Sequence, residues 1–195
     1  MRLPATVAEE GRYRLGSVRR AQGDGCVVIH AGSGSPHKCC PPALLADLIT
    51  RLRDQGLSPV LVIGPADGEV SARVRALTPF SMASFQDLGL MGAAGLVGAA
   101  DLYIGHDSGL THLAAALAVP TIALFGPTTV SRWAPRGPTV AALCGPPCRC
   151  DGWDQIRSCG EKPCLSVPVE AVLAACHRFL PGRSREQGVH VTRLP

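Results

Sequence analysis

Residues 100–135, ADLYIGHDSGLTHLAAALAVPTIALFGPTTVSRWAP, decide the fold of this chain. The stretch opens with a short apolar run at 101–104, which is typical of a buried strand, and continues into a polar turn at 105–109. The Ala- and Leu-rich segment 110–118 is predicted to be a helix, and 121–125 is predicted to be a second buried strand. A strand, a helix and a strand joined by short turns predict one unit of a parallel α/β sheet.

The polar residues of this turn form the first candidate site. Asp107 and Ser108 can cap the following helix, whose first-turn N–H groups are a ready site for an anion. Ser108 and His112 lie four residues apart and therefore share a helix face. Because open α/β sheets bind ligands at this edge, we predict a ligand site formed by Asp107, Ser108, Gly109 and His112. The alternative is a capped helix start with a structurally bonded histidine, and the spacing does not fit the Gly-x-Ser-x-Gly turn of serine hydrolases.

A second candidate element precedes this stretch in the chain. The apolar run 26–30 is predicted to be a strand, and the helical pattern at 41–55 begins with two prolines and is followed by a glycine. Between them lies a Gly/Ser-rich loop, whose small residues let the backbone approach phosphate oxygens and whose lysine would neutralise a diphosphate. Its candidate ligand residues are Ser33, Gly34, Ser35 and Lys38. The spacing fits neither a Walker A loop nor the dinucleotide fingerprint, so a simple turn is the alternative.

The rest of the chain continues the alternation of strands and helices. Further strands are predicted at 59–63, 80–85 and 139–143, and further helices at 70–77, 89–99 and 167–180. This order predicts the fold class α/β, with a Rossmann-like parallel sheet that helices cover on both faces. Glycines recur every third residue from 89 to 98 and predict a close approach of that helix to the sheet. Asp67 or Glu69 could accept hydrogen bonds from ribose hydroxyls, or could be exposed helix-capping acids.

A cysteine-rich segment lies between 144 and 164, with the spacing C-x3-C-x-C-x8-C-x4-C. Paired C-x2-C knuckles, which are typical of zinc sites, do not occur in it. Three states are open: metal binding, a redox-linked disulfide, or reduced thiols in a loop. The default expectation is no metal, and the candidate ligands for one are Cys148, Cys150, Cys159 and Cys164.

Composition and charge exclude several classes of function. The net charge is +4, the 17 Arg are scattered, and only 2 Lys and 8 aromatic residues are present, which disfavours nucleic acid binding. No apolar run approaches the roughly 20 residues of a membrane helix, and the N-terminus lacks a signal-peptide core, so a cytoplasmic protein is expected. Residues 1–24 are expected to be a linker or a remnant of a missing N-terminal domain, 25–180 the folded domain, and 181–195 a disordered tail.

Four stretches together resemble glycosyltransferase family 9, the lipopolysaccharide heptosyltransferases. They are VVIHAGSGSPHK (27–38), VLVIGPADGE (60–69), GHDSGLTHLAAALAVPTIALFGPT (105–128) and RWAP (132–135). The resemblance covers about residues 25 to 180 and implies the C-terminal, donor-binding half of a GT-B glycosyltransferase, in which two Rossmann-like domains face each other across a cleft. Two positions depart from the family pattern: His106 replaces an Asn, and Cys39-Cys40 stand where an aromatic residue is common.

The resemblance implies an inverting transfer of heptose from ADP-heptose to the inner core of lipopolysaccharide, without a metal or another cofactor. The loop 32–35 and Lys38 would hold the diphosphate, and Asp107 would hold sugar hydroxyls. The turn 108–109 would contribute N–H groups, and His112 would support the same corner. Lys38 and the helix N-terminus would stabilise the charge that develops on the leaving ADP.

The family's acidic general base lies in the N-terminal half, which has no counterpart in this chain, so no catalytic residue is expected here. We therefore expect weak binding of ADP or an ADP-sugar and no transfer by the chain alone. The lipopolysaccharide core would be bound by the absent N-terminal domain, and the full enzyme would associate peripherally with the inner membrane. The alternatives are a non-catalytic nucleotide-binding module or pseudoenzyme, a heptosyltransferase acting on a protein acceptor, and a Cys-cluster metal or redox protein.

Overall fold

The computed structural model describes residues 1–19 and 24–181 and contains a six-stranded sheet. Every adjacent pair of strands is parallel, and the strand order is β3-β2-β1-β4-β5-β6. The strands are β1 (Cys26–His30), β2 (Ser58–Ile63), β3 (Ser84–Gln86), β4 (Leu102–His106), β5 (Thr121–Phe125) and β6 (Val140–Cys144). This order is that of a doubly wound Rossmann sheet. The fold class predicted from the sequence is therefore confirmed.

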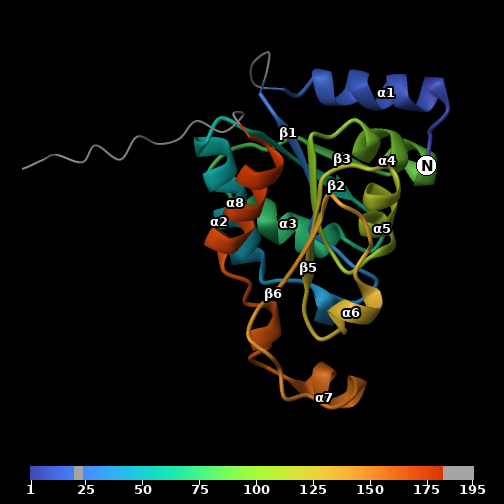
Figure 1. Cartoon of the computed structure of the whole chain (residues 1–195). Coiled ribbons are helices and arrows are strands. Elements are labelled where there is room, and N and C mark those ends of the chain that lie inside the picture. The colour runs from blue at the N-terminus through green and yellow to red at the C-terminus, as the bar shows by residue number, and fades with distance from the viewer. Residues whose placement is uncertain (20–23, 182–195) are drawn as a thin grey trace, which may run out of the picture.

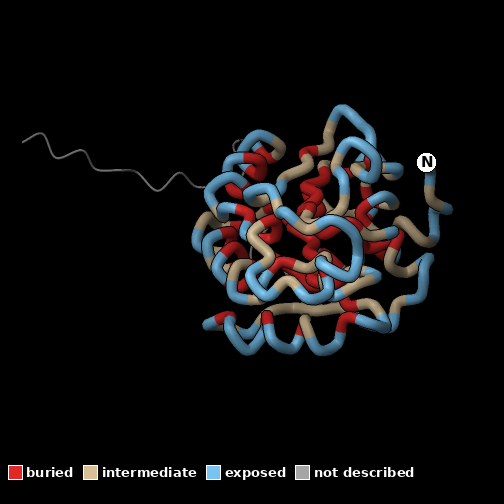
Figure 2. The backbone as a smooth tube through the Cα atoms, turned by 90° about the horizontal axis from the view of Figure 1, so that it is seen from below, coloured by how far each residue is buried: buried red, intermediate tan, exposed pale blue. Residues whose placement is uncertain are grey.

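Helices cover both faces of the sheet (Figure 1). One face packs against α2 (Pro42–Asp54), α3 (Gly68–Leu77) and α8 (Val169–Phe179), and the other against α1 (Ala5–Gly16), α4 (Gly89–Gly98) and α5 (Gly109–Ala116). In β1, Val27 and Ile29 contribute to the first core and Val28 to the second, because successive strand residues point to opposite faces. Figure 2 shows the buried residues in the centre of the molecule, inside a shell of exposed segments. The strands are runs of consecutive apolar residues, without alternating polar ones, because helices cover both faces of the sheet.

Helix boundaries follow the local signals read from the sequence. Pro41 and Pro42 stand at the start of α2, and Gly56 after its end has a φ of 83°, a left-handed conformation that glycine adopts without strain. The last strand and the last helix lie within a residue or two of the predicted ranges. The third strand, β3, is shorter than predicted and starts four residues later, at Ser84.

The N-terminal segment differs from the expected linker. Residues Ala5–Gly16 form α1, which lies across α4 and buries Leu15. A Cβ on Gly11 would lie 2.0 Å from the carbonyl oxygen of Gly95, and a Cβ on Gly95 would lie 2.5 Å from that of Val7. The glycines of α4 therefore allow a close helix–helix contact. The sequence predicted that these glycines approach the sheet, but in the structure they approach α1.

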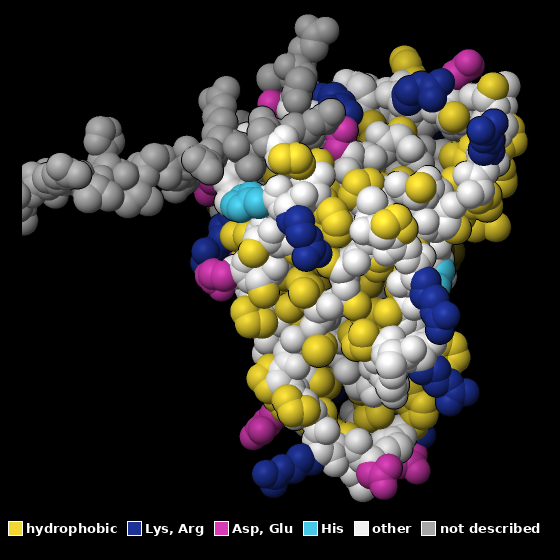
Figure 3. All heavy atoms as spheres, viewed as in Figure 1, with side chains coloured by type: hydrophobic (Ala, Val, Ile, Leu, Met, Phe, Trp, Pro, Cys, Tyr) yellow, Lys and Arg dark blue, Asp and Glu magenta, His cyan; other side chains and the backbone are white. Residues whose placement is uncertain are grey.

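The loops after β5 and β6 extend beyond the carboxyl edge of the sheet. The first contains α6 (Val130–Trp133), and the second contains α7 (Trp153–Ser158) and the short 3₁₀ helix η2 (Pro163–Leu165). Figure 1 shows α7 at the end of the molecule opposite α1. The expected disordered tail falls, from residue 182 on, outside the described residues. Among the helices that the structure describes, none has the length and apolar character needed to cross a bilayer. On the face seen in Figure 3, most Lys and Arg side chains lie near the edge, and Asp and Glu side chains are scattered among them.

Candidate functional site

The candidate site lies between β1 and β4, where the order in which the chain adds strands to the sheet reverses. Strands β1 and β4 are neighbours in the sheet but are far apart in the chain, and the loops that leave their carboxyl ends run to opposite faces. Such a switch point leaves a crevice in which open α/β sheets bind ligands. The loop after β1 carries the 3₁₀ helix η1 (Pro36–Lys38), and the loop after β4 leads into α5. These are the two loops that the sequence singled out.

The structure brings the two loops into direct contact. The Lys38 Nζ donates to the main-chain oxygen of Asp107 at 2.9 Å and lies 3.1 Å from its Oδ2. The Ser33 hydroxyl donates to the same main-chain oxygen at 2.8 Å. The side chains of Lys38 and Asp107 are 18% and 9% exposed, so this ion pair is screened by water only in part. The predicted juxtaposition of the lone loop lysine and the turn aspartate is therefore present in the fold.

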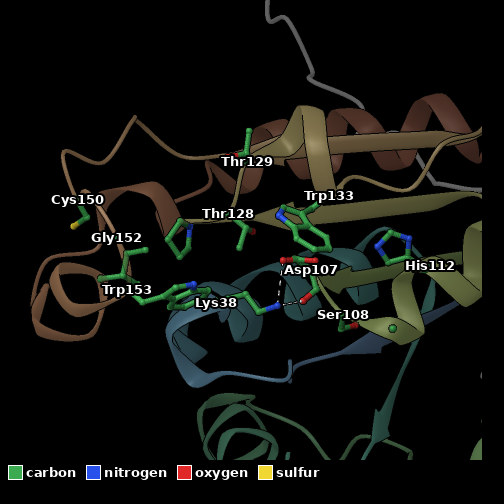
Figure 4. Close-up of a pocket in the computed structure, with 13 residues that line it drawn as sticks. Lys38, Asp107, Ser108, His112, Thr128, Thr129, Trp133, Cys150, Gly152 and Trp153 are labelled. Atoms are coloured by element: carbon green, nitrogen blue, oxygen red, sulfur yellow. Dashed lines mark hydrogen bonds and ion pairs between the residues drawn. The ribbon is translucent and has the colours of Figure 1, made fainter.

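A cavity of about 600 Å³ opens beside this pair, and Figure 4 shows Lys38 and Asp107 facing each other within it. The predicted residues Ser108, Gly109 and His112 also line it. Trp133 of α6 and Trp153 of α7 border the same cavity and were not singled out from the sequence. They are the only two tryptophans of the chain, and both remain about half exposed, at 48% and 44%. The sequence signal for Trp133 was its place in RWAP (132–135), one of the four stretches that carry the family resemblance, and Trp153 had no such signal.

A second, apolar cavity of about 460 Å³ adjoins the first. Ser108 and Gly109 line both, so the N-terminus of α5 separates the two spaces. The apolar side chains of this second cavity are Val62, Ile63, Pro65, Ala66, Leu88, Leu90, Ala93 and Leu110. Ser33 and Gly34 line its near side, while Ser35 caps η1 by accepting from the N–H of His37 at 3.3 Å.

Ser108 occupies the N-cap position of α5 but does not cap it. Its hydroxyl makes no hydrogen bond to the helix N–H groups, and Asp107 makes none either. The Ser108 Oγ lies instead 3.2 Å from the Thr111 Oγ1 and 3.5 Å from the His30 Nδ1. The predicted side-chain cap is therefore wrong, and the first-turn N–H groups of α5 are not covered by the side chains that precede them.

Asp67 stands at the N-cap of α3, but it is buried rather than exposed and its side chain does not cap the helix. It is 5% exposed, and its Oδ2 accepts from the His30 Nε2 at 2.7 Å and from the N–H of Gly64 at 2.9 Å. These bonds, the one from His30 first, lower the pKa of Asp67, which therefore stays ionised. Gly32 makes room for this carboxylate, because a Cβ there would lie 1.7 Å from the Asp67 Oδ1. Glu69 remains exposed beside the loop after β1.

His106, which departs from the family pattern, fixes the loop after β1 to β4. Its Nε2 accepts from the N–H of Cys40 at 2.9 Å, so its Nδ1 carries the proton and donates to the Gly32 oxygen at 3.3 Å. The side chain is fully buried, and burial lowers its pKa to about 4, with the nearby His30 adding to the shift. His106 is therefore a neutral structural residue at physiological pH.

Three cysteines of the predicted cluster converge beside the site. The Sγ atoms of Cys148, Cys150 and Cys159 all lie within 4.8 Å of one another, and those of Cys148 and Cys150 are 3.1 Å apart. A cavity of about 10 Å³ lies among them and is also bordered by Cys164. The contact between the first two thiols lowers the pKa of Cys148 and raises that of Cys150 to about 12. All nine cysteines of the chain fall in the described residues and are free thiols, so the structure contains no disulfide.

Comparisons with known proteins agree with the fold and the motifs. The model of glycosyltransferase family 9 (heptosyltransferase) matches residues 7–152. Lipopolysaccharide heptosyltransferase 1 of Pseudomonas aeruginosa is 31% identical over 193 residues, which cover 98% of this chain and 51% of that protein. A family 9 glycosyl transferase from Veillonella parvula superposes with a TM-score of 0.77 at 22% identity, over 92% of this chain and 53% of the other.

The structure of E. coli heptosyltransferase WaaC with ADP gives a TM-score of 0.65 at 22% identity, over 87% of this chain and 48% of that one. This chain thus spans about half the length of the curated relatives that it matches. The matching family model covers most of the chain, including both loops of the candidate site. On this evidence the chain is a member of glycosyltransferase family 9.

Proposed function

We propose that this chain is the donor-binding half of a heptosyltransferase and binds a nucleoside diphosphate sugar, with ADP-heptose as the expected donor. The observation that carries the proposal is the contact of Lys38 with Asp107 at the mouth of α5, with a cavity on either side. Residues 25–180 form the binding domain in this proposal, and α1 packs on it. The same sheet edge supplies a cation, a carboxylate, hydroxyls and unoccupied helix N–H groups, which together suit a sugar linked to a diphosphate.

The two cavities suggest how the donor lies. The diphosphate would sit at Ser108 and Gly109, which both cavities share, within reach of the α5 N-terminus. The nucleoside would occupy the apolar cavity, since a base offers flat apolar faces. The sugar would occupy the larger cavity, where Asp107 can accept hydrogen bonds from hydroxyls and Trp133 offers an aromatic face.

Lys38 would hold the diphosphate in the complex. In the free chain its ammonium is bonded to Asp107, so donor binding would replace part of this contact with bonds to phosphate oxygens. When the sugar–phosphate bond breaks, the leaving diphosphate gains negative charge, which Lys38 and the α5 N-terminus would stabilise as it develops. Ser33 keeps Asp107 in place meanwhile through the bond to its main-chain oxygen.

An acceptor hydroxyl and a general base complete the proposed reaction. We place both in a partner half of the enzyme, with the inner core of lipopolysaccharide as the acceptor and the cytoplasmic side of the inner membrane as the location. The chain alone would then bind the donor and transfer nothing, because an inverting transfer needs a base at the acceptor hydroxyl. A nucleotide-binding pseudoenzyme would share the binding properties but would stay inactive when its partner half is added.

Calorimetric titration of the purified chain with ADP, UDP and GDP tests the binding proposal. We expect ADP to bind most tightly, and Lys38→Ala to weaken it by about tenfold or more, since a charge-assisted hydrogen bond is lost. Arg51→Ala removes a cation on α2 that pairs with Asp47 and should leave ADP binding unchanged. Equal affinities of the wild type and Lys38→Ala would contradict the proposal, and so would sugar transfer by the chain without any partner.

The thiol cluster is proposed as a structural metal site beside the donor cavity. Four cysteine side chains around one small cavity match the tetrahedral thiolate set that zinc or iron prefers. The cluster ties Cys148 and Cys150 to Cys159, the C-cap residue of α7, and α7 carries Trp153 to the donor cavity. A metal there would stabilise this wall of the cavity without taking part in the reaction.

Elemental analysis of protein purified without chelator tests the metal site. We expect about one zinc or iron per chain, lost in Cys159→Ser and retained in Cys144→Ser, whose exposed thiol lies outside the close triad. Thermal unfolding should show a lower Tm after metal removal in the wild type only. A wild type that holds no metal, and whose Tm does not change when zinc or ferrous iron is supplied, would rule the site out.

A further inference from the structure

Three polar side chains form a line across the carboxyl edge of the sheet, and all three border the second cavity. Asp67 follows β2, His30 ends β1 and Ser108 follows β4, and these three strands are neighbours in the sheet. The His30 Nε2 lies 2.7 Å from the Asp67 Oδ2, and its Nδ1 lies 3.5 Å from the Ser108 Oγ. The line therefore runs from a buried carboxylate to the hydroxyl that both donor cavities share.

The inner part of this line is a built feature of the fold. His30 is 7% exposed and Asp67 is 5% exposed, so the pair is largely shielded from water. Asp67 is ionised and is fixed by the N–H of Gly64, and Gly32 leaves it space that any side chain would fill. A buried carboxylate bonded to one ring nitrogen orients the imidazole and stabilises its protonated form.

The hydroxyl of Ser108 has two acceptors within the fold, the His30 Nδ1 at 3.5 Å and the Thr111 Oγ1 at 3.2 Å, and the Thr111 hydrogen itself goes to the main-chain oxygen of His106. When His30 is neutral with its proton on Nε2, its Nδ1 can accept from Ser108. When His30 is protonated, Nδ1 carries a proton and the Ser108 oxygen accepts from it. The Ser108 hydrogen then turns toward Thr111 or toward a phosphate oxygen. Protonation of His30 thus removes one of the two acceptors that compete with a ligand for the Ser108 hydrogen.

We propose that His30 is a positioning residue that takes up a proton when a nucleoside diphosphate sugar binds, and so directs the Ser108 hydroxyl toward the diphosphate. The inference rests on the proposed donor site and adds a proton linkage to it. Binding of the anion and protonation of His30 favour each other, because the imidazolium is held between the Asp67 carboxylate and a hydroxyl that contacts the phosphate. Donor affinity should therefore rise as the pH falls toward 6.

The other ionisable groups around His30 limit which residue could hold a proton that is taken up on binding. His106 on β4 faces it but is buried and keeps its pKa near 4, so it stays neutral above pH 5. Tyr103 on β4 is fully buried, which raises its pKa and keeps its hydroxyl neutral. His112 on α5 is exposed at the larger cavity and is the other histidine close to the proposed diphosphate position. The test must therefore separate His30 from His112.

Calorimetry with ADP-glucose in buffers of different ionisation enthalpy measures the protons taken up on binding. ADP-glucose is the probe because its diphosphate is a diester and does not titrate between pH 5 and 8, whereas the terminal phosphate of ADP does. At pH 7 we expect net uptake of up to about one proton per chain in the wild type. His30→Gln and Asp67→Asn should abolish the uptake, and His30→Gln should weaken binding by about tenfold at pH 6.

Two control variants and the wild type itself keep the test decisive. His177→Gln changes an exposed histidine on α8 that contacts Gln55 and should retain full uptake, and His112→Gln should retain it as well. Wild-type measurements need no variant, so binding without proton uptake overturns this inference even if a substitution disturbs folding. Uptake that survives in His30→Gln and disappears in His112→Gln overturns it too. Absence of binding of both ADP-glucose and ADP contradicts the proposed function itself.

Discussion

The ammonium of Lys38 lies 2.9 Å from the main-chain oxygen of Asp107 and 3.1 Å from its carboxylate, across 69 residues of sequence. One cation therefore joins the loop after β1 to the turn after β4. Because these strands are neighbours, the pair closes the crevice at the switch point of the sheet. The same contact stabilises the free protein and keeps a cation at the place where a diphosphate is proposed to bind.

The Lys38–Asp107 pair should contribute measurably to stability. A double-mutant cycle of Lys38→Met and Asp107→Asn, followed by urea unfolding, should give a coupling energy of about 1 kcal/mol or more, since both side chains are mostly buried. The control cycle, Arg14→Met with Glu10→Gln, removes a more exposed pair on α1 and should give about 0.5 kcal/mol or less. Equal coupling in the two cycles would show that the inter-loop pair is no stronger than a surface pair.

Gly32 and Gly34 should respond in opposite ways to the same substitution. In Gly32→Ala the new methyl group would collide with the Asp67 carboxylate, so we expect a loss of about 1–3 kcal/mol in the free energy of unfolding. In Gly34→Ala the methyl group would meet nothing within 4 Å, and stability should change by less than about 0.5 kcal/mol. Chemical denaturation of both variants checks this, and a tolerated Gly32→Ala would contradict the packing around Asp67.

His106 should make the protein less stable as the pH falls below 6.5. Its pKa drops from 6.5 in the unfolded chain to about 4 in the fold, so between these values the unfolded state binds the proton and gains stability. Between pH 6.5 and 5 the free energy of unfolding should fall by about 2 kcal/mol from this residue. Asp67 affects stability at lower pH. Because its pKa is lowered in the fold, its contribution to the free energy of unfolding is lost only as the pH falls through 3.8 and below.

Urea unfolding at pH 7.5 and pH 5 measures this dependence. The variant His106→Asn has no titrating ring and should lose less stability between the two pH values than the wild type does. His177→Gln serves as the matched control, because it removes an exposed histidine and should follow the wild type. If His106→Asn and the wild type lose equal stability, the acid sensitivity arises elsewhere in the molecule.

The strands and the location of the site could be predicted because they depend on local signals. Short apolar runs between Gly-rich turns identify buried parallel strands, and the carboxyl ends of such strands share one edge of the sheet. The loop with Lys38 and the turn with Asp107 follow two of these strands, so their meeting requires only that the two strands be neighbours. The helix α5 follows from the same reasoning, but its uncovered N–H groups do not, because Asp107 and Ser108 were predicted to cap them.

Features that depend on strand order or on distant packing could not be read in this way. The bond between His30 and Asp67 requires β1 to lie beside β2, which the sequence order allows but does not require. Trp133 and Trp153 reach one cavity from separate helices after β5 and β6, and no periodic pattern links them. The helix α1 was missed because its contact with α4 uses glycines, so its apolar stripe is weak.

The crossing of Gly11 over Gly95 also determines how short this polypeptide can be made. Each backbone fills the volume that a methyl group on the other helix would need, so a different helix could not replace α1 without new collisions. A version that starts at Gly25 would uncover the face of α4 that carries Gly95, and would remove Leu15, which is buried in the same core as Cys26. The minimal autonomous folding unit therefore begins with the first helix rather than with the first strand.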